Sequence, residues 1–435
     1  MWAYESTFYQ IYPLGFCGAP FPNNDVKSNR LTLINNFIPH LKYIGINALI
    51  LNPLFESDNH GYDTRDFKNV DLRLGTNSDL KNLICNLHKS NIRVLLDGVF
   101  NHVGRGFIFF QDVLQNREAS PYKDWFYINF SGNNFYNDNL SYEGWEGHFE
   151  LVRLNLQNPK VSDYLIDVVN FWINEFNIDG LRLDVSYCLD HAFLSRLRHE
   201  TSIIKDDFFL LGEILNGDYK TIMNDDMCHS ATNYECYKGL YSSMNSYNLF
   251  EIVHSLKRQF GPESWTLYNG MHLLSFVDNH DVTRISSILN NKNHLKLIYS
   301  LMFFMPGIPC IYYGSEWGIT GNKTDGDVAL RPAIIEPITN DLSEYIKVLT
   351  SIRQSCNVLA YGDFSDLLLT NKQCILQRSL CDDRILLALN IDDVSFHAFF
   401  NTSILHAHDL INNLDIDFDN GIDIPAYTAM MLHPY

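Results

Sequence analysis

Short apolar runs and helix-like periods alternate along the first three quarters of the chain. A run that is apolar at nearly every position predicts a strand buried on both faces, as in a parallel sheet covered by helices. Seven such runs stand out, and a weaker eighth lies at residues 230–234. The seven are residues 8–12, 48–52, 94–99, 180–185, 208–214, 273–277 and 308–313.

Apolar residues spaced three and four apart predict helices between these strands. Asn158 before Pro159 predicts the start of one of them, since Asn caps helices and Pro is favoured in the first turn. Eight strands alternating with helices predict an α/β protein with a (β/α)8 TIM barrel. The clearest helical periods are Ile34, Phe37, Ile38 and Leu41; Leu80, Leu83, Ile84 and Leu87; and Val161, Tyr164, Leu165, Val168, Val169 and Trp172.

The segment 297–313 is apolar enough to raise the question of a membrane span. Pro306 and Pro309 interrupt it, and a spanning helix needs about 20 apolar residues. We therefore predict a buried helix to about Met305, then the strand 308–313, and no membrane partner.

Two segments depart from the alternating pattern. Residues 104–158 follow the third predicted strand and are rich in aromatic and turn-forming residues, which is typical of a functional insertion or small subdomain. Beyond residue 356, short apolar runs near 367–369, 384–390 and 428–433 predict an antiparallel β domain. The predicted division is a barrel of residues 1–103 and 159–355, an inserted subdomain of residues 104–158 and a C-terminal domain of residues 356–435.

Composition and charge narrow the class of protein. Hydrophobic residues make up 46% of the chain and charged residues 19%, which fits a globular protein. The net charge of −19 argues against nucleic acid as a partner. An odd number of cysteines, nine, without Cys-x-x-Cys favours reduced thiols, and the amino terminus resembles no signal peptide. We expect a cytoplasmic protein; its oligomeric state is not predicted.

Carboxylates follow three of the predicted strands: Asp184, Glu213, and the pair Asp278 and Asp281. The carboxyl ends of barrel strands carry the active site in this fold class. Arg182 lies two residues before Asp184 on the same strand face, which favours the ionised acid. Glu213 follows an apolar run, which favours the neutral acid. One ionised and one neutral acid suit glycoside hydrolysis.

A single acid at a strand end is more often a helix cap or an ion-pair partner. Four polar strand ends together favour one shared site instead, because the third strand also ends in polar residues, up to His102. The four blocks resemble those of the α-amylase family of retaining α-glucosidases and transglycosylases, and the resemblance covers essentially the whole chain. They are Asp-Gly-Val-Phe-Asn-His at 97–102, Gly-Leu-Arg-Leu-Asp at 180–184, Gly-Glu at 212–213 and Phe-Val-Asp-Asn-His-Asp at 276–281.

This resemblance implies a barrel with a B subdomain after the third strand and a C-terminal β-sandwich. It also implies that Asp184 is the catalytic nucleophile and Glu213 the general acid and base, with carboxyl groups about 5 to 5.5 Å apart. Asp281, rather than Asp278, would bind the 2- and 3-hydroxyls of the sugar.

The resemblance further implies four substrate-binding residues. Tyr62 would stack on the sugar ring, His102 and His280 would donate hydrogen bonds to it, and Arg182 would support the nucleophile. Arg331 looks like an arginine that follows the last strand of the family's barrel. Trp145 is a candidate sugar platform; packing within the subdomain is the alternative reading of its indole ring.

Many members of the family hold calcium beside the B subdomain, and this chain departs from that pattern. It keeps Asn101, but Asn155 stands where the family has aspartate and Cys188 where it has histidine. Because calcium prefers several oxygen ligands, we predict no calcium there and no cofactor. The sequence also starts without the additional β domain of dimeric maltogenic amylases and cyclomaltodextrinases, so we expect no dimer through such a domain.

The main hypothesis is a retaining hydrolase of α-1,4-linked malto-oligosaccharides, with or without transglycosylation. Alternatives with the same acids act on α-1,6-glucosides, trehalose or sucrose, or mainly transfer glucan chains. An alternative that is not an enzyme is a glucan-binding protein that keeps the fold without activity. That alternative predicts that at least one of the three acids is missing. A metal-dependent hydrolase using Asp97, His102 and His280 is the last alternative.

Overall fold

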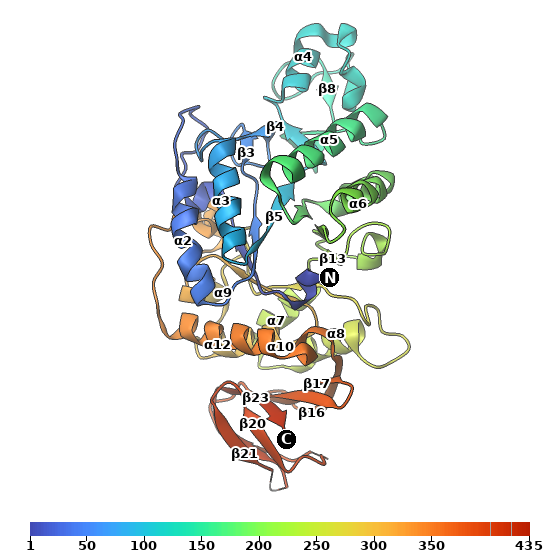
Figure 1. Cartoon of the computed structure of the whole chain (residues 1–435). Coiled ribbons are helices and arrows are strands. Elements are labelled where there is room, and N and C mark those ends of the chain that lie inside the picture. The colour runs from blue at the N-terminus through green and yellow to red at the C-terminus, as the bar shows by residue number, and fades with distance from the viewer. Residues whose placement is uncertain (401, 419) are drawn as a thin grey trace.

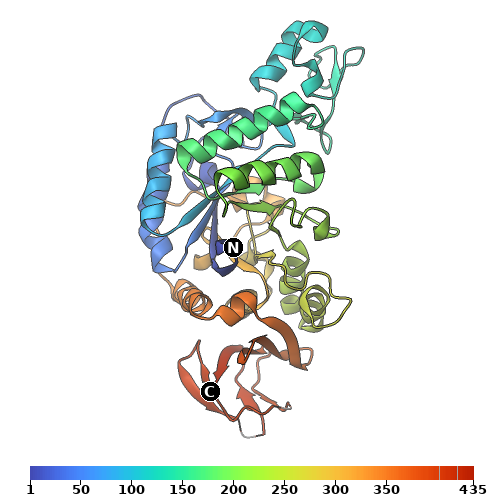
Figure 2. The same cartoon turned by 45° about the vertical axis from the view of Figure 1, so that its right-hand side comes forward.

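The computed structural model describes residues 1–400, 402–418 and 420–435. Eight parallel strands form a barrel in which spatial neighbours follow chain order. A bridge between Thr232 and Leu274 joins the ends of the row. The predicted (β/α)8 barrel is thereby confirmed (Figures 1 and 2). Its strands are β1 (Phe8–Ile11), β2 (Ala48–Leu51), β5 (Arg93–Gly98), β11 (Gly180–Leu183), β12 (Phe209–Gly212), β13 (Ser230–Ala231), β14 (Leu274–Ser275) and β15 (Ile308–Tyr312).

The sixth and seventh barrel strands are shorter than the pattern predicts. The predicted strand 230–234 ends at Ala231, because Asn233 instead caps the following helix by accepting a hydrogen bond from the backbone N of Cys236 at 3.0 Å. The predicted strand 273–277 keeps two residues.

The three clearest predicted helices are present, and Asn158 caps the third by accepting from the backbone N of Lys160 at 3.0 Å. The apolar segment 297–313 divides as predicted into α10 (His294–Phe304) and β15. Among the described residues, no helix is both long and apolar enough to cross a membrane. The other helices are α1 (Pro13–Phe16), α2 (Leu31–Tyr43), α3 (Asn77–Lys89), α4 (Ile108–Asn116), α5 (Pro159–Phe176), α6 (His191–Ile204), α7 (Tyr234–Ser246), α8 (Phe250–Phe260), α9 (Ile285–Ile288), α11 (Asp327–Leu330), α12 (Asp341–Ser355) and α13 (Asn357–Tyr361).

Two insertions shape the face at the carboxyl ends of the strands. One is the hairpin of β3 (Phe55–Ser57) and β4 (Thr64–Val70), whose connecting loop holds Tyr62. The other follows β5, and its last strand pairs antiparallel with its first, which ties the insertion back to the barrel. Its elements are β6 (His102–Gly104), α4, β7 (Ile128–Asn129), β8 (Ser141–Tyr142), β9 (Gly144–Trp145) and β10 (His148–Arg153).

The C-terminal strands form a six-stranded antiparallel sheet and a two-stranded sheet that share a buried apolar layer including Ile375, Ile422 and Met430. Figure 1 shows this unit and the insertion at opposite ends of the barrel. The strands are β16 (Asp363–Leu369), β17 (Gln373–Leu380), β18 (Asp383–Asn390), β19 (Phe396–Ala398), β20 (His406–Asp409), β21 (Leu414–Asp417), β22 (Ile422–Ile424) and β23 (Thr428–Pro434).

Candidate active site

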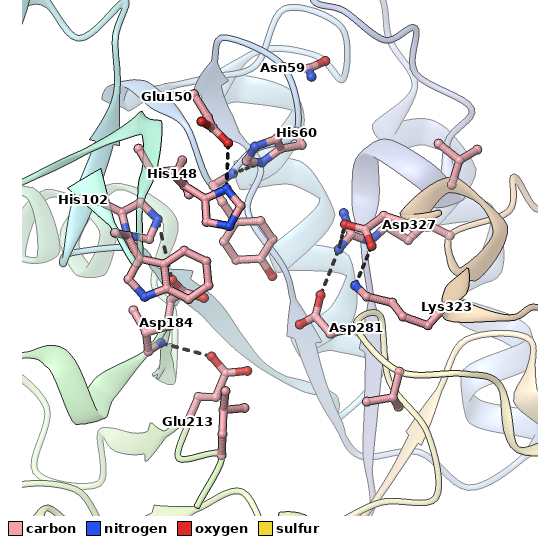
Figure 3. A pocket seen from close by; sticks show the side chains of 18 of the residues that line it. Asn59, His60, His102, His148, Glu150, Asp184, Glu213, Asp281, Lys323 and Asp327 are labelled. Carbon is pink, nitrogen blue, oxygen red and sulfur yellow. Dashed lines mark hydrogen bonds and ion pairs between the residues drawn. The ribbon is translucent and has the colours of Figure 1, made fainter. Parts of the chain in front are cut away.

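A cavity of about 910 Å³ lies at the carboxyl ends of the barrel strands. Asp184 and Glu213 line one wall and Asp281 lines the opposite wall (Figure 3). Tyr62 and His102 also line it, whereas Arg182 and His280 lie behind these side chains, 4% and 1% exposed. The structure therefore gathers all seven predicted site residues around one pocket.

The first wall is organised by a single guanidinium group. Arg182 Nη1 donates to Asp184 Oδ1 at 3.0 Å and to Asp97 Oδ2 at 2.8 Å, while Nη2 pairs with Glu213 Oε1. One buried cation thus bridges three carboxylates. Because it bridges Asp184 and Glu213 directly, it holds their carboxyl groups close together.

This sharing changes the expected ionisation of the wall. Burial raises the pKa of Asp184 well above its ordinary value; Arg182 opposes this, and Glu213, Asp97 and Asp281 add to it. Arg182 favours the ionised form of Asp184, as expected, but burial and the neighbouring acids outweigh its effect on the pKa. Glu213 is buried after an apolar strand, as expected, but its carboxyl also pairs with Arg182, which the sequence did not predict.

The backbone beyond Asp184 turns sharply to serve this wall. Val185 adopts a left-handed conformation, with φ 37° and ψ 47°, which is rare for a β-branched residue. Its backbone N donates to Glu213 Oε2 at 3.0 Å. The turn thereby ends β11 and orients the second acid, and such backbone strain is typical of active sites.

His102 offers a free donor to the cavity. Asn101 Nδ2 lies 3.1 Å from His102 Nδ1, so Nδ1 accepts and Nε2 carries the proton. Burial, together with His60 and His148, lowers the pKa of His102 to about 3, which keeps the ring neutral. Nε2 is buried, 3.9 Å from Asp184 Oδ2, and has no hydrogen-bond partner among the described residues.

The opposite wall is built around Asp281. Its Oδ1 accepts from Arg331 Nη2 at 2.9 Å, and its Oδ2 lies 3.0 Å from His280 Nε2. Gln10 Nε2 donates to His280 Nδ1 at 3.2 Å, so Nε2 of that ring is the donor toward Asp281. Burial opposes the charge of Asp281, but His280, Arg331 and Arg182 outweigh it and hold its pKa well below the ordinary value.

Tyr62 connects the two walls. Its hydroxyl contacts His280 Nε2 and lies 3.5 Å from Asp97 Oδ2. The Tyr62 and His280 rings lie nearly parallel, with centroids 5.8 Å apart. Trp145, the candidate platform, also lines the cavity, beside His102. The position of Tyr62 leaves its ring available for stacking on a bound ring.

Asp278, the alternative to Asp281, has another position. It is 1% exposed and accepts hydrogen bonds from the backbone N of Ile285 at 2.8 Å and from Ser315 Oγ at 2.7 Å. Its carboxyl group does not line the cavity. The geometry therefore favours Asp281 as the acid that can reach a ligand.

Sequence reasoning missed several residues of the site. Gln10 and Asn52 hold the buried network, with Asn52 Nδ2 donating to Asp97 Oδ2 at 2.9 Å. A polar residue within or just after a buried apolar strand was the available signal. Lys323 and Asp327 line the far wall from two short helical turns after β15, a 3-10 turn at Lys323–Asp325 and α11, which are too short to show a hydrophobic period.

The residues at the family's calcium position do not fit that ion. Burial raises the pKa of the Cys188 thiol, so its sulfur stays protonated, and position 155 offers a neutral amide in place of a carboxylate. In the part of the chain that the structure describes, no three His, Cys, Asp or Glu side chains gather in a way that could hold a metal ion. Asp97, His102 and His280 therefore form no such group.

Comparison with known proteins gives the family. Residues 10–356 match the family model described as the alpha amylase catalytic domain. The chain belongs to the α-amylase family. It is therefore a glycosidase of that family, and the resemblance drawn from the four sequence blocks is confirmed.

Relatives of this α-amylase family member include the intracellular maltogenic amylase of Bacillus subtilis, which is 30% identical over 99% of this chain and 74% of that protein. A cyclomaltodextrinase of Geobacillus thermopakistaniensis is 32% identical over 83% of this chain and 64% of its own length. Among solved structures, a cyclomaltodextrinase aligns with a TM-score of 0.87 at 26% identity, covering 100% of this chain and 78% of that one.

Proposed function

We propose that this chain is a retaining glycoside hydrolase of α-1,4-linked malto-oligosaccharides and related α-glucans that also transfers glucosyl units to sugars. The observation that carries the proposal is the bridging of Asp184 and Glu213 by Arg182, opposite Asp281, in one cavity. The relatives, a maltogenic amylase and a cyclomaltodextrinase, support this substrate class by name.

In the first step, an Asp184 oxygen attacks the anomeric carbon while the bond to the leaving oxygen breaks. Glu213 donates its proton to that oxygen, and a covalent glucosyl ester forms. In the second step Glu213, now ionised, takes a proton from water or a sugar hydroxyl. That oxygen attacks the anomeric carbon and releases Asp184.

The excess of acids over cations around Arg182 favours one protonated acid on this wall. Asp97, Asp184 and Glu213 surround the single cation Arg182, so full ionisation would leave uncompensated buried charge. Retaining one proton relieves this, and Glu213 is the acid that passes it on. Once the ester forms, Asp184 carries no charge, and Glu213 can remain ionised beside Arg182 and act as a base.

The remaining residues bind the sugar in this proposal. Asp281 is held ionised by Arg331 and His280, and 37% of its side chain is exposed, so its carboxylate can accept hydrogen bonds from two hydroxyls. His102 Nε2 is a buried donor that a sugar hydroxyl can satisfy. Tyr62 supplies the ring on which the sugar stacks.

We propose the same domain division as the sequence pattern indicates: a barrel of residues 1–103 and 159–355, a B subdomain of 104–158 and a C-terminal β-sandwich of 356–435. The antiparallel pairing of β6 with β10 supports the second unit. We also propose a cytoplasmic location and no nucleic-acid partner, which the nine unpaired cysteines and the net charge of −19 support.

Anomer-resolved NMR of the first products from maltoheptaose tests the mechanism. We expect the α-anomer before mutarotation, together with longer oligosaccharides at high substrate concentration. First products in the β-anomer would contradict the proposal. The same assay with a cyclic maltodextrin, panose, isomaltose and trehalose separates the α-1,4 substrates from the alternatives.

A further inference from the structure

Arg284 is a fully buried arginine that does not line the cavity. It contacts three backbone carbonyls of one segment, residues 313–331, which follows β15. Nη1 donates to the O of Tyr313 at 2.7 Å, the backbone N donates to the O of Gly321 at 2.9 Å, and Nη2 donates to the O of Leu330 at 2.8 Å. One residue thus holds the start, middle and end of the segment.

Asp278 fixes this arginine from the strand side. Arg284 Nη1 donates to Ser315 Oγ at 3.0 Å, and Ser315 Oγ donates to Asp278 Oδ1 at 2.7 Å. The guanidinium also lies over the Tyr312 ring, 4.0 Å from its centroid. The acid that does not reach the cavity is therefore an anchor for Arg284.

The segment that Arg284 holds carries Arg331, the residue after Leu330. Arg331 Nε donates to the O of His280 at 3.0 Å, and Nη2 donates to Asp281 Oδ1 at 2.9 Å. A continuous path of contacts therefore runs from Arg284 through the Leu330 backbone to the acid on the second wall of the cavity.

We propose that Arg284 is a positioning residue for the reaction. It fixes segment 313–331 so that Arg331 holds Asp281 in the place and charge state that sugar binding needs. The proposal rests on the role proposed above for Asp281. A guanidinium is required because two donors in a rigid plane reach the Tyr313 and Leu330 carbonyls at once, which a lysine ammonium cannot do.

The test is a double-mutant cycle on kcat/KM with Arg284→Lys and Arg331→Lys. Small displacements of a binding group cost up to about 100-fold. We expect Arg331→Lys to lower kcat/KM about 30-fold and Arg284→Lys about 10-fold. The double variant should be close to Arg331→Lys alone, because the first residue acts through the second.

Arg378 provides a matched control. It is also a fully buried arginine that donates to backbone carbonyls, those of Gly362 and Phe304, but it lies where the barrel meets the C-terminal sheet. Arg378→Lys should lower the melting temperature and leave kcat/KM within about 2-fold, as expected for a distant site. Any small effect of Arg378→Lys on kcat/KM should combine multiplicatively with the effect of Arg331→Lys in the double variant.

Effects of Arg284→Lys and Arg331→Lys that multiply, or an unchanged kcat/KM for Arg284→Lys, would overturn the inference. If Arg284→Lys does not fold, Asp278→Asn replaces it, with an expected loss of about 3-fold to 10-fold that disappears in the Arg331→Lys background. A loss of kcat/KM from Asp278→Asn that persists in the Arg331→Lys background would overturn the inference. Unchanged activity of Asp281→Asn would overturn the proposed role of Asp281 and this inference with it.

Discussion

The two walls of the cavity shift the pKa of their acids in opposite directions. On the wall of β11 and β12, one arginine serves three carboxylates, and burial raises the pKa of Asp184. On the wall beyond β14, two carboxylates, Asp281 and Asp327, share Arg331 and have His280 and Lys323 as further partners, and the pKa of Asp281 is lowered. The surroundings of Asp184 disfavour its charge, whereas those of Asp281 favour its charge.

The difference matches the two tasks that a glycosidase needs. Bond cleavage requires a proton that can leave and return, which an excess of acids over cations provides. Holding sugar hydroxyls requires a carboxylate that stays ionised. Both walls come from the same kind of strand end and each has one buried arginine, so the number of acids for each basic group sets their roles.

The largest effect is expected from Asp184→Asn. Without the nucleophile no glucosyl ester forms, and kcat on maltoheptaose should fall by at least about 10⁴-fold. Circular dichroism should show an unchanged fold, and a ligand such as acarbose should still bind. Activity within 10-fold of the parent would remove Asp184 from the role of nucleophile.

Glu213→Gln tests the mobile proton of the first wall. General acid catalysis contributes about 10²-fold to 10⁴-fold, so kcat on maltoheptaose should fall by that amount. An aryl glucoside whose leaving group needs no proton should lose much less in formation of the ester, measured as the burst of released phenol. Equal losses on both substrates would assign the proton to another group.

The stability of the two Asn variants should change in opposite directions. Asp184 has a raised pKa, so its ionised form destabilises the fold above its ordinary titration range, and Asp184→Asn should add about 1 kcal/mol at pH 7. This gain should vanish as pH falls below that range. Asp281 has a lowered pKa, so it stabilises the fold at neutral pH.

For Asp281→Asn we expect a loss of at most about 1 kcal/mol at pH 7, because 37% of the side chain is exposed and solvent weakens its ion pairs. That loss should disappear only in strong acid, as pH falls through the lowered pKa. Urea unfolding at several pH values measures both variants. If the free energy of unfolding changes in the same direction in Asp184→Asn and Asp281→Asn, the electrostatic difference between the walls is contradicted.

The smallest effect is expected from removing metal ions. Among the described residues, neither wall contains a set of His, Cys, Asp or Glu side chains suited to a metal, and Cys188 replaces an oxygen or nitrogen ligand at the family's calcium position. Incubation with EDTA should therefore leave kcat and the melting temperature unchanged. Losses that calcium restores would show a site made by other residues.

The hydrophobic pattern predicted the barrel because its strands are apolar on both faces, and α10 with β15 because proline divides them. It made the strands at 230–234 and 273–277 too long. The first ends early because Asn233 caps α7, and a hydrophobic period does not show such a cap. Short strands of the insertion carry too few residues to show a period.

The acids of the site were predictable from their places at strand ends, but their protonation was not. The sequence shows Arg182 beside Asp184, whereas only the folded chain shows that Asp97 and Glu213 share the same guanidinium. Similarly, Arg331 reaches Asp281 across 50 residues of chain, a contact that no local pattern records.

Trapping the glucosyl ester tests the central claim most directly. A 5-fluoro-α-glucosyl fluoride forms the ester but slows its hydrolysis, so mass spectrometry of the digested protein locates the attached sugar. The predicted result is one fluoroglucosyl group on the peptide that contains Asp184, and none in Asp184→Asn. A label on Asp97, Glu213 or Asp281 in the unmodified chain would contradict the roles assigned to the two walls.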